Sequence, residues 1–130
     1  MRRRMLMASL VVVALVGAGC ASMIILGAAA GAGSGALVWY RGWLEQTIGE
    51  PLDRVHRAGR SALADLKVAL VEDELEGTTG LLDGYDEGSK RIVVKMKAMD
   101  DKATRVRIRV GFWGDQHRSL RILEQLKKHL

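Results

Sequence analysis

Cys20 is the residue whose chemistry is easiest to interpret, because it is the only cysteine of the chain and cannot form an intramolecular disulfide. Three arginines at the start of the chain precede an apolar stretch from Met5 to Val16, and a Gly-Ala-Gly segment stands directly before the cysteine. A basic start, an apolar stretch and a small-residue zone, in this order, are typical of an export signal. A thiol at the end of that zone is a nucleophile to which acyl chains can be attached. The sequence therefore predicts a signal peptide over residues 1–19 and acylation of Cys20.

The alternative is that the N-terminal segment stays uncut and spans a membrane. No charged residue occurs between Met5 and Tyr40, and one straight helix over this run would be roughly 54 Å long. The hydrocarbon core of a bilayer is only about 30 Å thick. Cleavage before Cys20 removes this mismatch, and it lowers the formal net charge of +5 by the three N-terminal arginines. The small remaining excess, on an exported chain, argues against a nucleic-acid partner.

Residues 20–38 have two competing interpretations. Their content of glycine, alanine and serine is typical of a flexible tether after a lipid anchor, and each interior glycine costs a helix about 1 kcal/mol relative to alanine. On a helix, however, a spacing of four places glycines on one face, which allows close helix contact inside a membrane. The composition favours the tether. The alternative is a glycine zipper that drives self-association, formed by Gly27, Gly31 and Gly35.

Groups able to perform catalysis are scarce in the rest of the sequence. Asp115 and His117 are an acid and an imidazole close together, but side chains two positions apart at a helix start point in different directions. We therefore expect Asp115 to cap the helix and His117 to be solvated. The sequence contains no second cysteine and no HExxH or CxxC spacing for a metal site. The sequence predicts a protein with no catalytic residue, metal or cofactor.

Cations that alternate along two predicted strands indicate a binding function instead. Side chains two positions apart on a strand share a face, so these cations would form a basic patch for anionic lipid headgroups, lipopolysaccharide phosphates or an acidic protein. The patch consists of Lys95, Lys97, Arg105, Arg107 and Arg109. We expect acidic residues of the preceding strands to neutralise much of it through cross-strand pairs. These are Glu72, Asp73, Glu74, Glu76, Asp83, Asp86 and Glu87.

Aromatic residues gather at two places. Phe112 and Trp113 follow the last predicted strand, and the pattern predicts a turn that closes the end of the core, with ligand or membrane contact as the alternative. Trp39, Tyr40 and Trp43 stand beside the predicted tether. They fit the headgroup level of a membrane, which amphipathic rings prefer, as well as they fit the core.

The elements that position these groups follow from periodicity and turn residues. Apolar residues at spacings of three and four predict a helix that starts at Pro51 and ends near Leu70. A second helix with a leucine face follows Asp115 and runs to Leu130. Alternation and turn residues predict strands over residues 39–47, 68–75, 77–85, 90–99 and 104–112, with Val106, Ile108, Val110 and Phe112 facing inward on the last of them.

The predicted fold is an α+β two-layer sandwich of one small domain over residues 39–130. Its antiparallel sheet has four to five strands with two helices on one face, in the order β-α-β-β-β-β-α. About 90 residues are enough for one hydrophobic core and too few for two domains.

The whole pattern resembles a family of small bacterial envelope lipoproteins of uncharacterised function. The most specific part of the resemblance is residues 107–130, where a strand, a Val-Gly turn, a Gly-Asp pair and an amphipathic helix run together. The segment after Cys20 and the helix start Pro51-Leu-Asp-Arg-Val resemble it too. Gly17 departs from the family pattern, since lipoprotein signals usually carry leucine three residues before the cysteine.

The resemblance implies a lipid-anchored protein of the cell envelope that faces the periplasm, with no assigned activity. Ala21 after the cysteine, in place of aspartate, resembles sorted lipoproteins of the outer membrane of a Gram-negative cell. The implied partners are the membrane, through acylated Cys20, and an envelope protein or anionic lipid. We expect a structural or interaction domain. An anionic ligand-binding domain and an uncleaved membrane protein that oligomerises are the alternatives.

Overall fold

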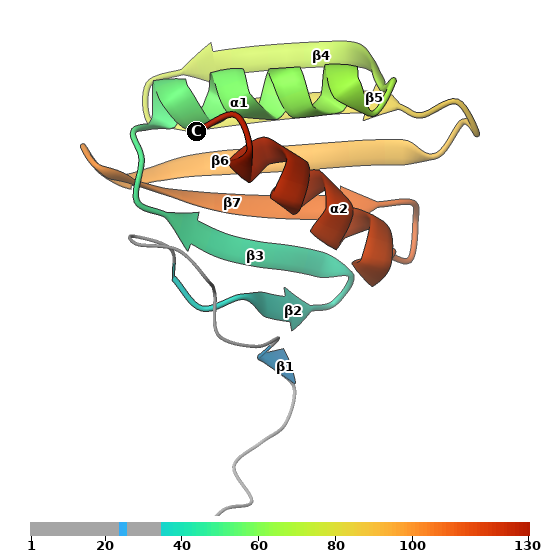
Figure 1. Ribbon diagram of the computed structural model, residues 1–130, viewed down its shortest axis with the longest axis horizontal. Coiled ribbons are helices and arrows are strands. Elements are labelled where there is room, and N and C mark those ends of the chain that lie inside the picture. Colours follow the sequence, from blue (N-terminus) through green and yellow to red (C-terminus); the bar gives the residue numbers. More distant parts are fainter. Residues whose placement is uncertain (1–23, 26–34) are drawn as a thin grey trace, which may run out of the picture.

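The structure is a computed structural model that describes residues 24–25 and 35–130 (Figure 1). The predictions made for the signal peptide, for Cys20, for Gly27 and Gly31, and for most of the tether lie outside the described residues.

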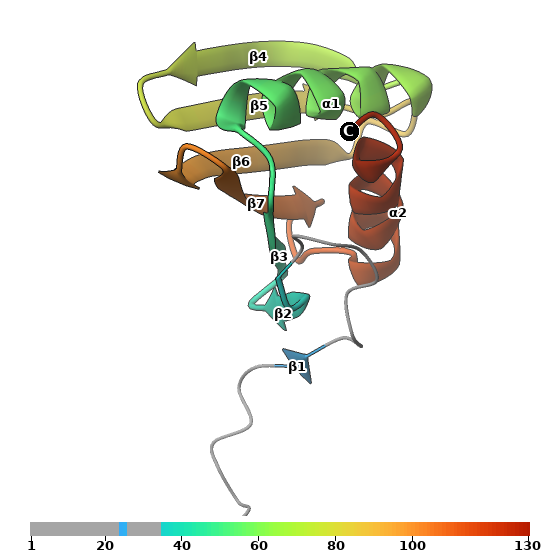
Figure 2. The same ribbon diagram turned by 60° about the vertical axis from the view of Figure 1, so that its left-hand side comes forward.

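The described strands form one antiparallel sheet in the order β1-β2-β3-β7-β6-β5-β4. Its six longer strands are β2 (Val38–Tyr40), β3 (Trp43–Ile48), β4 (Ala69–Glu76), β5 (Thr79–Tyr85), β6 (Arg91–Asp100) and β7 (Ala103–Val110). The two-residue β1 (Ile24–Ile25) pairs with β2 at one edge. The helices α1 (Leu52–Asp65) and α2 (Gln116–Lys127) lie on the same face of this sheet (Figures 1 and 2).

The α+β class and the antiparallel sheet are confirmed, but the predicted number of strands is too small and the order of elements differs. Residues 39–47, predicted as a single strand, contain the hairpin of β2 and β3. Arg41 and Gly42 turn the chain there, with φ angles of 50° and 83°. Two successive positive φ angles are what a tight two-residue hairpin turn requires. The sequence gives little sign of this turn, because arginine seldom adopts a positive φ.

Helix α1 ends five residues before the predicted end near Leu70. Val68 N donates to Leu63 O at 2.9 Å and Lys67 N donates to Ala64 O at 3.1 Å, while Lys67 has a φ of 58°. These two bonds and the left-handed residue form a Schellman motif, which closes a helix and satisfies its last carbonyls. Ala69, which lies within the predicted helix, is therefore an exposed residue of β4.

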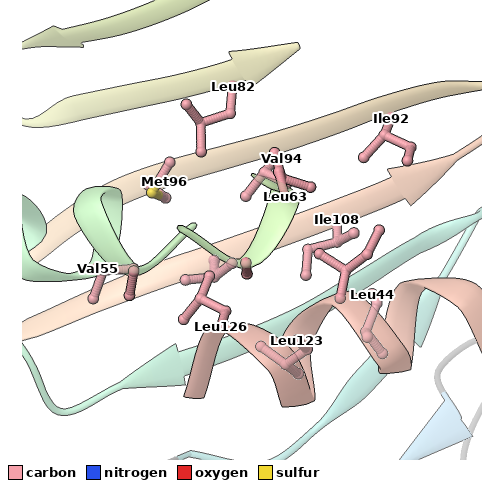
Figure 3. Packing of buried hydrophobic residues seen from close by; sticks show 14 of the residues in the cluster. Leu44, Val55, Leu63, Leu82, Ile92, Val94, Met96, Ile108, Leu123 and Leu126 are labelled. Carbon is pink, nitrogen blue, oxygen red and sulfur yellow. The ribbon is translucent and has the colours of Figure 1, made fainter. Parts of the chain in front are cut away.

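The hydrophobic core lies between the sheet and the two helices (Figure 3). Alternate residues of β6 and β7 face it, as the alternating pattern predicts, and so does one face of each helix. Fully buried members include Leu44, Val55, Leu63, Leu82, Val94, Ile108 and Leu126. Figure 3 shows side chains of both helices pointing toward those of the sheet. The core therefore occupies one side of the sheet.

The inward position predicted for Phe112 is wrong. Strand β7 ends at Val110, and Gly111 follows with a φ of 74°, which ends the alternation of the strand. Phe112 and Trp113 therefore do not close the end of the core, because their side chains are 77% and 84% exposed.

Candidate anion-binding face

The side of the sheet opposite the helices is uncovered in the part of the chain that the structure describes (Figure 2). We call the outward-facing residues of β3, β5, β6 and β7 the open face. Arg105, Arg107 and Arg109 alternate there with buried residues of β7, and Lys95 and Lys97 do the same on β6. Pairing of the two strands places Lys95 opposite Arg107 and Lys97 opposite Arg105. The five cations of the predicted patch therefore share one surface.

An indole ring that the sequence did not assign to the patch lies among these cations. The centroid of the Trp43 ring is 4.9 Å from Arg107 Cζ, 5.2 Å from Lys95 Nζ and 5.7 Å from Arg109 Cζ. A cation within about 6 Å of a ring centroid is attracted by the negative face of the ring. Trp43 thus helps to hold three cations close together despite their mutual repulsion.

The carboxylate that pairs with the patch is Glu45 of β3, and not one of the acidic residues predicted for this role. Its two oxygens lie 3.3 Å from Arg105 Nε and 3.5 Å from Arg107 Nε. Lys95, Lys97 and Arg109 form no ion pair with the described residues. One carboxylate therefore neutralises five cations only in part.

Most of the acidic residues predicted to neutralise the patch have other partners. Asp83 accepts two hydrogen bonds from Arg91, from Nε at 3.1 Å and from Nη2 at 2.5 Å. This carboxylate raises the pKa of Arg91 above its usual value, first through the hydrogen bonds and then through its charge. Asp86 pairs with Arg118 of α2. Glu87 Oε1 lies 3.9 Å from Lys67 Nζ.

The acidic residues of β4 line the rim of the open face. Glu74 faces the same side as Leu81 and Lys95, which follow it across the sheet. A hydrogen bond with the Glu72 side chain, and then the Glu72 charge, raise the pKa of Glu74. Glu74 and Glu76 lie on one side of a hollow of about 490 Å³, and the cations lie on the other. These cations are Lys95, Lys97, Arg105 and Arg107.

Gly35 is the member of the predicted zipper that lies within the described residues. Its backbone N donates to Thr47 O at 2.7 Å, and its carbonyl accepts from Gln46 Nε2 at 2.8 Å. Both bonds fasten the segment before β2 to β3. The zipper itself stays a prediction.

The structure places the two residues considered for catalysis as the sequence analysis expects. Asp115 caps α2 by accepting a hydrogen bond from Arg118 N at 3.1 Å, and His117 is exposed. The described residues contain no group of three or more His, Cys, Asp or Glu side chains placed to hold a metal ion.

An acid and imidazole pair that the sequence analysis missed joins α1 to β4. Buried His56 has Nε2 2.6 Å from Asp73 Oδ1, and Arg60 Nε lies 2.9 Å from the other oxygen of this carboxylate. Asp73 therefore fastens an edge strand to two side chains of the helix. The pair is 17 residues apart in the sequence, and only the fold brings its members together.

A second histidine joins the ends of the two helices and provides a pH-dependent test. His129 Nε2 lies 2.5 Å from Asp65 Oδ2. Its hydrogen bond, followed by that of Gln125, lowers the pKa of Asp65. A lowered carboxyl pKa stabilises the fold above the pKa of the unfolded chain, and this contribution is lost as pH falls through the folded pKa.

We expect the substitution His129→Ala to raise the pKa of Asp65 toward its ordinary value, because the largest cause of the lowered pKa is removed. NMR titration of the side-chain carboxyl of Asp65 measures this change. His117→Ala, which removes an exposed imidazole at the other end of α2, is the control and should leave the titration of Asp65 unchanged. Equal titration of Asp65 in both variants would contradict the role given to His129.

Neither of the helices that the structure describes is long and apolar enough to cross a membrane.

No curated protein matches the chain. A model of the family described as "Protein of unknown function (DUF3568)" matches residues 4–129, which is nearly the whole sequence. The chain therefore belongs to this family of unknown function.

Proposed function

We propose that this chain is a lipid-anchored protein of the cell envelope, attached through acylated Cys20, whose domain binds an acidic segment of an envelope protein on the open face. The observation that carries the binding proposal is the group of cations around Trp43, which Glu45 neutralises only in part. The anchoring part rests on the sequence before residue 21, with its basic start, apolar stretch and single cysteine.

Physical chemistry favours an anion at this place. Like charges held close together repel each other, and a bound carboxylate or phosphate relieves that repulsion. Charge-assisted hydrogen bonds from guanidinium groups are roughly twice as strong as neutral ones. The partly exposed ring of Trp43 adds a flat apolar contact for the ligand. The acidic rim at Glu74 and Glu76 would position the ligand over β6 and β7 by repelling it from β4.

A phosphate-bearing lipid or lipopolysaccharide is the second candidate ligand. The open face has a second hollow of about 430 Å³, in addition to the one that Glu74 and Glu76 line. This second hollow favours the lipid ligand. This hollow is lined by Trp43, Arg91, Val93, Lys95, Arg109, Gly111 and Phe112. It combines cations with aromatic surface, which suits a phosphate attached to a hydrocarbon chain.

Binding is tested with the full chain in detergent micelles. The variant Lys95→Gln with Arg107→Gln removes two of the cations around Trp43, and we expect affinity for a glutamate-rich peptide to fall roughly tenfold or more, equal to about 1.4 kcal/mol. Isothermal titration calorimetry measures the affinity. Micelles that carry phosphate-bearing lipid, used as the second probe, distinguish the two candidate ligands.

The control for this experiment is Arg54→Gln with Arg57→Gln, which removes two exposed cations of α1, on the helix side of the sheet. This variant should bind both probes as the unsubstituted chain does. If the two double variants lose affinity equally, only net charge matters and the open face is not the binding site. The same conclusion follows if neither probe binds the unsubstituted chain.

Anchoring is tested by the intact mass of the protein extracted from membranes. A species that starts at Cys20 and carries added acyl mass would support the lipid anchor. A full-length, unmodified mass would instead favour the uncleaved membrane segment. Substitution of Gly31 by leucine would then test the zipper, because close glycine contacts are needed for its oligomers.

A further inference from the structure

We propose that Phe112 and Trp113, which we call the aromatic tip, insert into the headgroup region of an anionic bilayer and fix the orientation of the domain. Both side chains are largely exposed, and their rings contact each other edge to face with centroids 4.9 Å apart. Two adjacent exposed aromatic rings form a concentrated apolar surface, and such surface commonly marks a place of interaction.

The backbone holds the aromatic tip in a fixed position. Gly111 and Gly114 on either side of it have φ angles of 74° and 84°. A Cβ atom at Gly114 would lie 2.4 Å from Gly42 Cα, so the loop packs directly on the turn between β2 and β3. The guanidinium of Arg109 donates to the carbonyl of Phe112. The rings are therefore presented on a supported loop, which lowers the entropic cost of insertion.

Cations surround the aromatic tip, and this charge favours an anionic lipid surface as the partner. Lys90 and Arg91 line the same hollow of about 740 Å³ as the tip, and Arg41 lies in the turn that contacts Gly114. Arg41, Lys90 and Arg109 form no ion pair with the described residues, whereas Arg91 pairs with Asp83. Asp115, the carboxylate that lines this hollow, caps α2.

The combination of aromatic rings and flanking cations suits the membrane interface. Tryptophan is enriched at the headgroup level because its ring is apolar and its N–H group is polar. Lysine and arginine are attracted to an anionic lipid surface, and this attraction adds to that of the aromatic rings.

The path of the chain places the proposed lipid anchor at the same end of the domain, a step that rests on the proposed function. Strand β1 runs antiparallel to β2, with Ile24 opposite Trp39 and Ile25 opposite Val38. β1 therefore enters the sheet from the end that holds the Arg41–Gly42 turn, beside the aromatic tip. Cys20 precedes Ile24 by four positions, with three residues between them, and a stretch of this length reaches at most about 14 Å. An acyl chain on Cys20 and the aromatic tip would thus meet one membrane, and the open face would stand beside it.

Quenching of tryptophan fluorescence by brominated lipids tests the insertion. The full chain, as extracted, is reconstituted into vesicles of brominated phosphatidylcholine with phosphatidylglycerol, and emission is compared with that in unbrominated vesicles. We expect quenching in the unsubstituted chain and loss of most of it in Trp113→Phe, which keeps an aromatic ring at the tip. Trp39→Phe is the matched control and should retain the quenching, because Trp39 is partly buried against the core.

Charge dependence gives the second measurement. Arg41→Gln with Lys90→Gln should reduce the quenching in vesicles that contain phosphatidylglycerol, whereas Arg54→Gln with Arg57→Gln should not. Equal quenching in Trp113→Phe and the unsubstituted chain would overturn the proposal. An emission shift of Trp113 that depends on protein concentration, without lipid quenching, would also overturn it and indicate contact with a second copy.

This readout is independent of the anchor. Brominated lipid reports the position of Trp113 whether the chain is held by an acylated Cys20 or by an uncleaved segment. A mass that shows no acylation together with quenching of Trp113 would reject the lipid anchor and keep the aromatic tip. A mass that shows acylation, without quenching of Trp113, would keep the lipid anchor and reject insertion of the aromatic tip.

Discussion

Replacement of Leu126 by alanine is expected to lower the free energy of unfolding by about 2–5 kcal/mol. The side chain of Leu126 is 0% exposed and belongs to α2. A Cβ atom added at Gly59 of α1 would lie 3.5 Å from Leu126 Cδ1, so this leucine packs where the two helices meet. Removal of three of its carbon atoms leaves a cavity that two helices and a sheet cannot close without moving.

Urea denaturation followed by circular dichroism measures this loss. Leu75→Ala is the matched control, because Leu75 lies on the edge strand β4 and is 47% exposed. An exposed substitution of this kind usually changes stability by no more than about 0.5 kcal/mol. Equal midpoints for the two variants would contradict the packing of α2 against α1. For a domain whose total stability is about 5–15 kcal/mol, the loss expected for Leu126→Ala is large.

The position of Leu126 illustrates what the sequence predicts well. Leucines at spacings of three and four mark the buried face of α2, and strict alternation marks the buried face of β7. Asp115 caps its helix, because an aspartate directly before an amphipathic segment is a preferred N-cap residue. These features depend on residues within one or two turns of each other, and local rules are sufficient for them.

The features that the sequence did not predict depend on backbone conformations that the residue types do not indicate. Lys67 ends α1 in a left-handed conformation that glycine usually adopts, and Arg41 does the same in the β2–β3 turn. Neither position carries the expected glycine or asparagine. The predicted helix therefore extends beyond the end of α1, and the single strand predicted over residues 39–47 contains both β2 and β3.

The candidate site shows the same division. The five cations follow from alternation along β6 and β7, which is local. Their association with Trp43 and Glu45 depends on the pairing of β3 with β7, which lies far along the chain. Sequence alone gives no register for this pair, so the prediction assigned the neutralisation of the patch to acidic residues of the preceding strands. The register places Glu45 opposite Arg107 instead.

Replacement of Gly114 by alanine is expected to cost about 3 kcal/mol or more in free energy of unfolding. The φ of 84° is strained for alanine, and the added Cβ would lie 2.4 Å from both Cα and O of Gly42. Backbone atoms cannot rotate away as a flexible side chain does. The loop would therefore have to move off the β2–β3 turn, and the aromatic tip would move with it.

Gly111→Ala separates the two causes of this loss, because Gly111 lies in the same loop with a φ of 74° but has no atom within 4 Å of an added Cβ. We expect it to cost only about 1–2 kcal/mol, from the backbone conformation alone. Thermal unfolding of both variants gives the difference, which measures the close contact between the two turns. If Gly114→Ala is no less stable than Gly111→Ala, the contact contributes nothing and the aromatic tip is not held in place by it. If Gly114→Ala is less stable and folded, lipid quenching of Trp113 should decrease with it, because insertion requires the loop to present both rings from a fixed position.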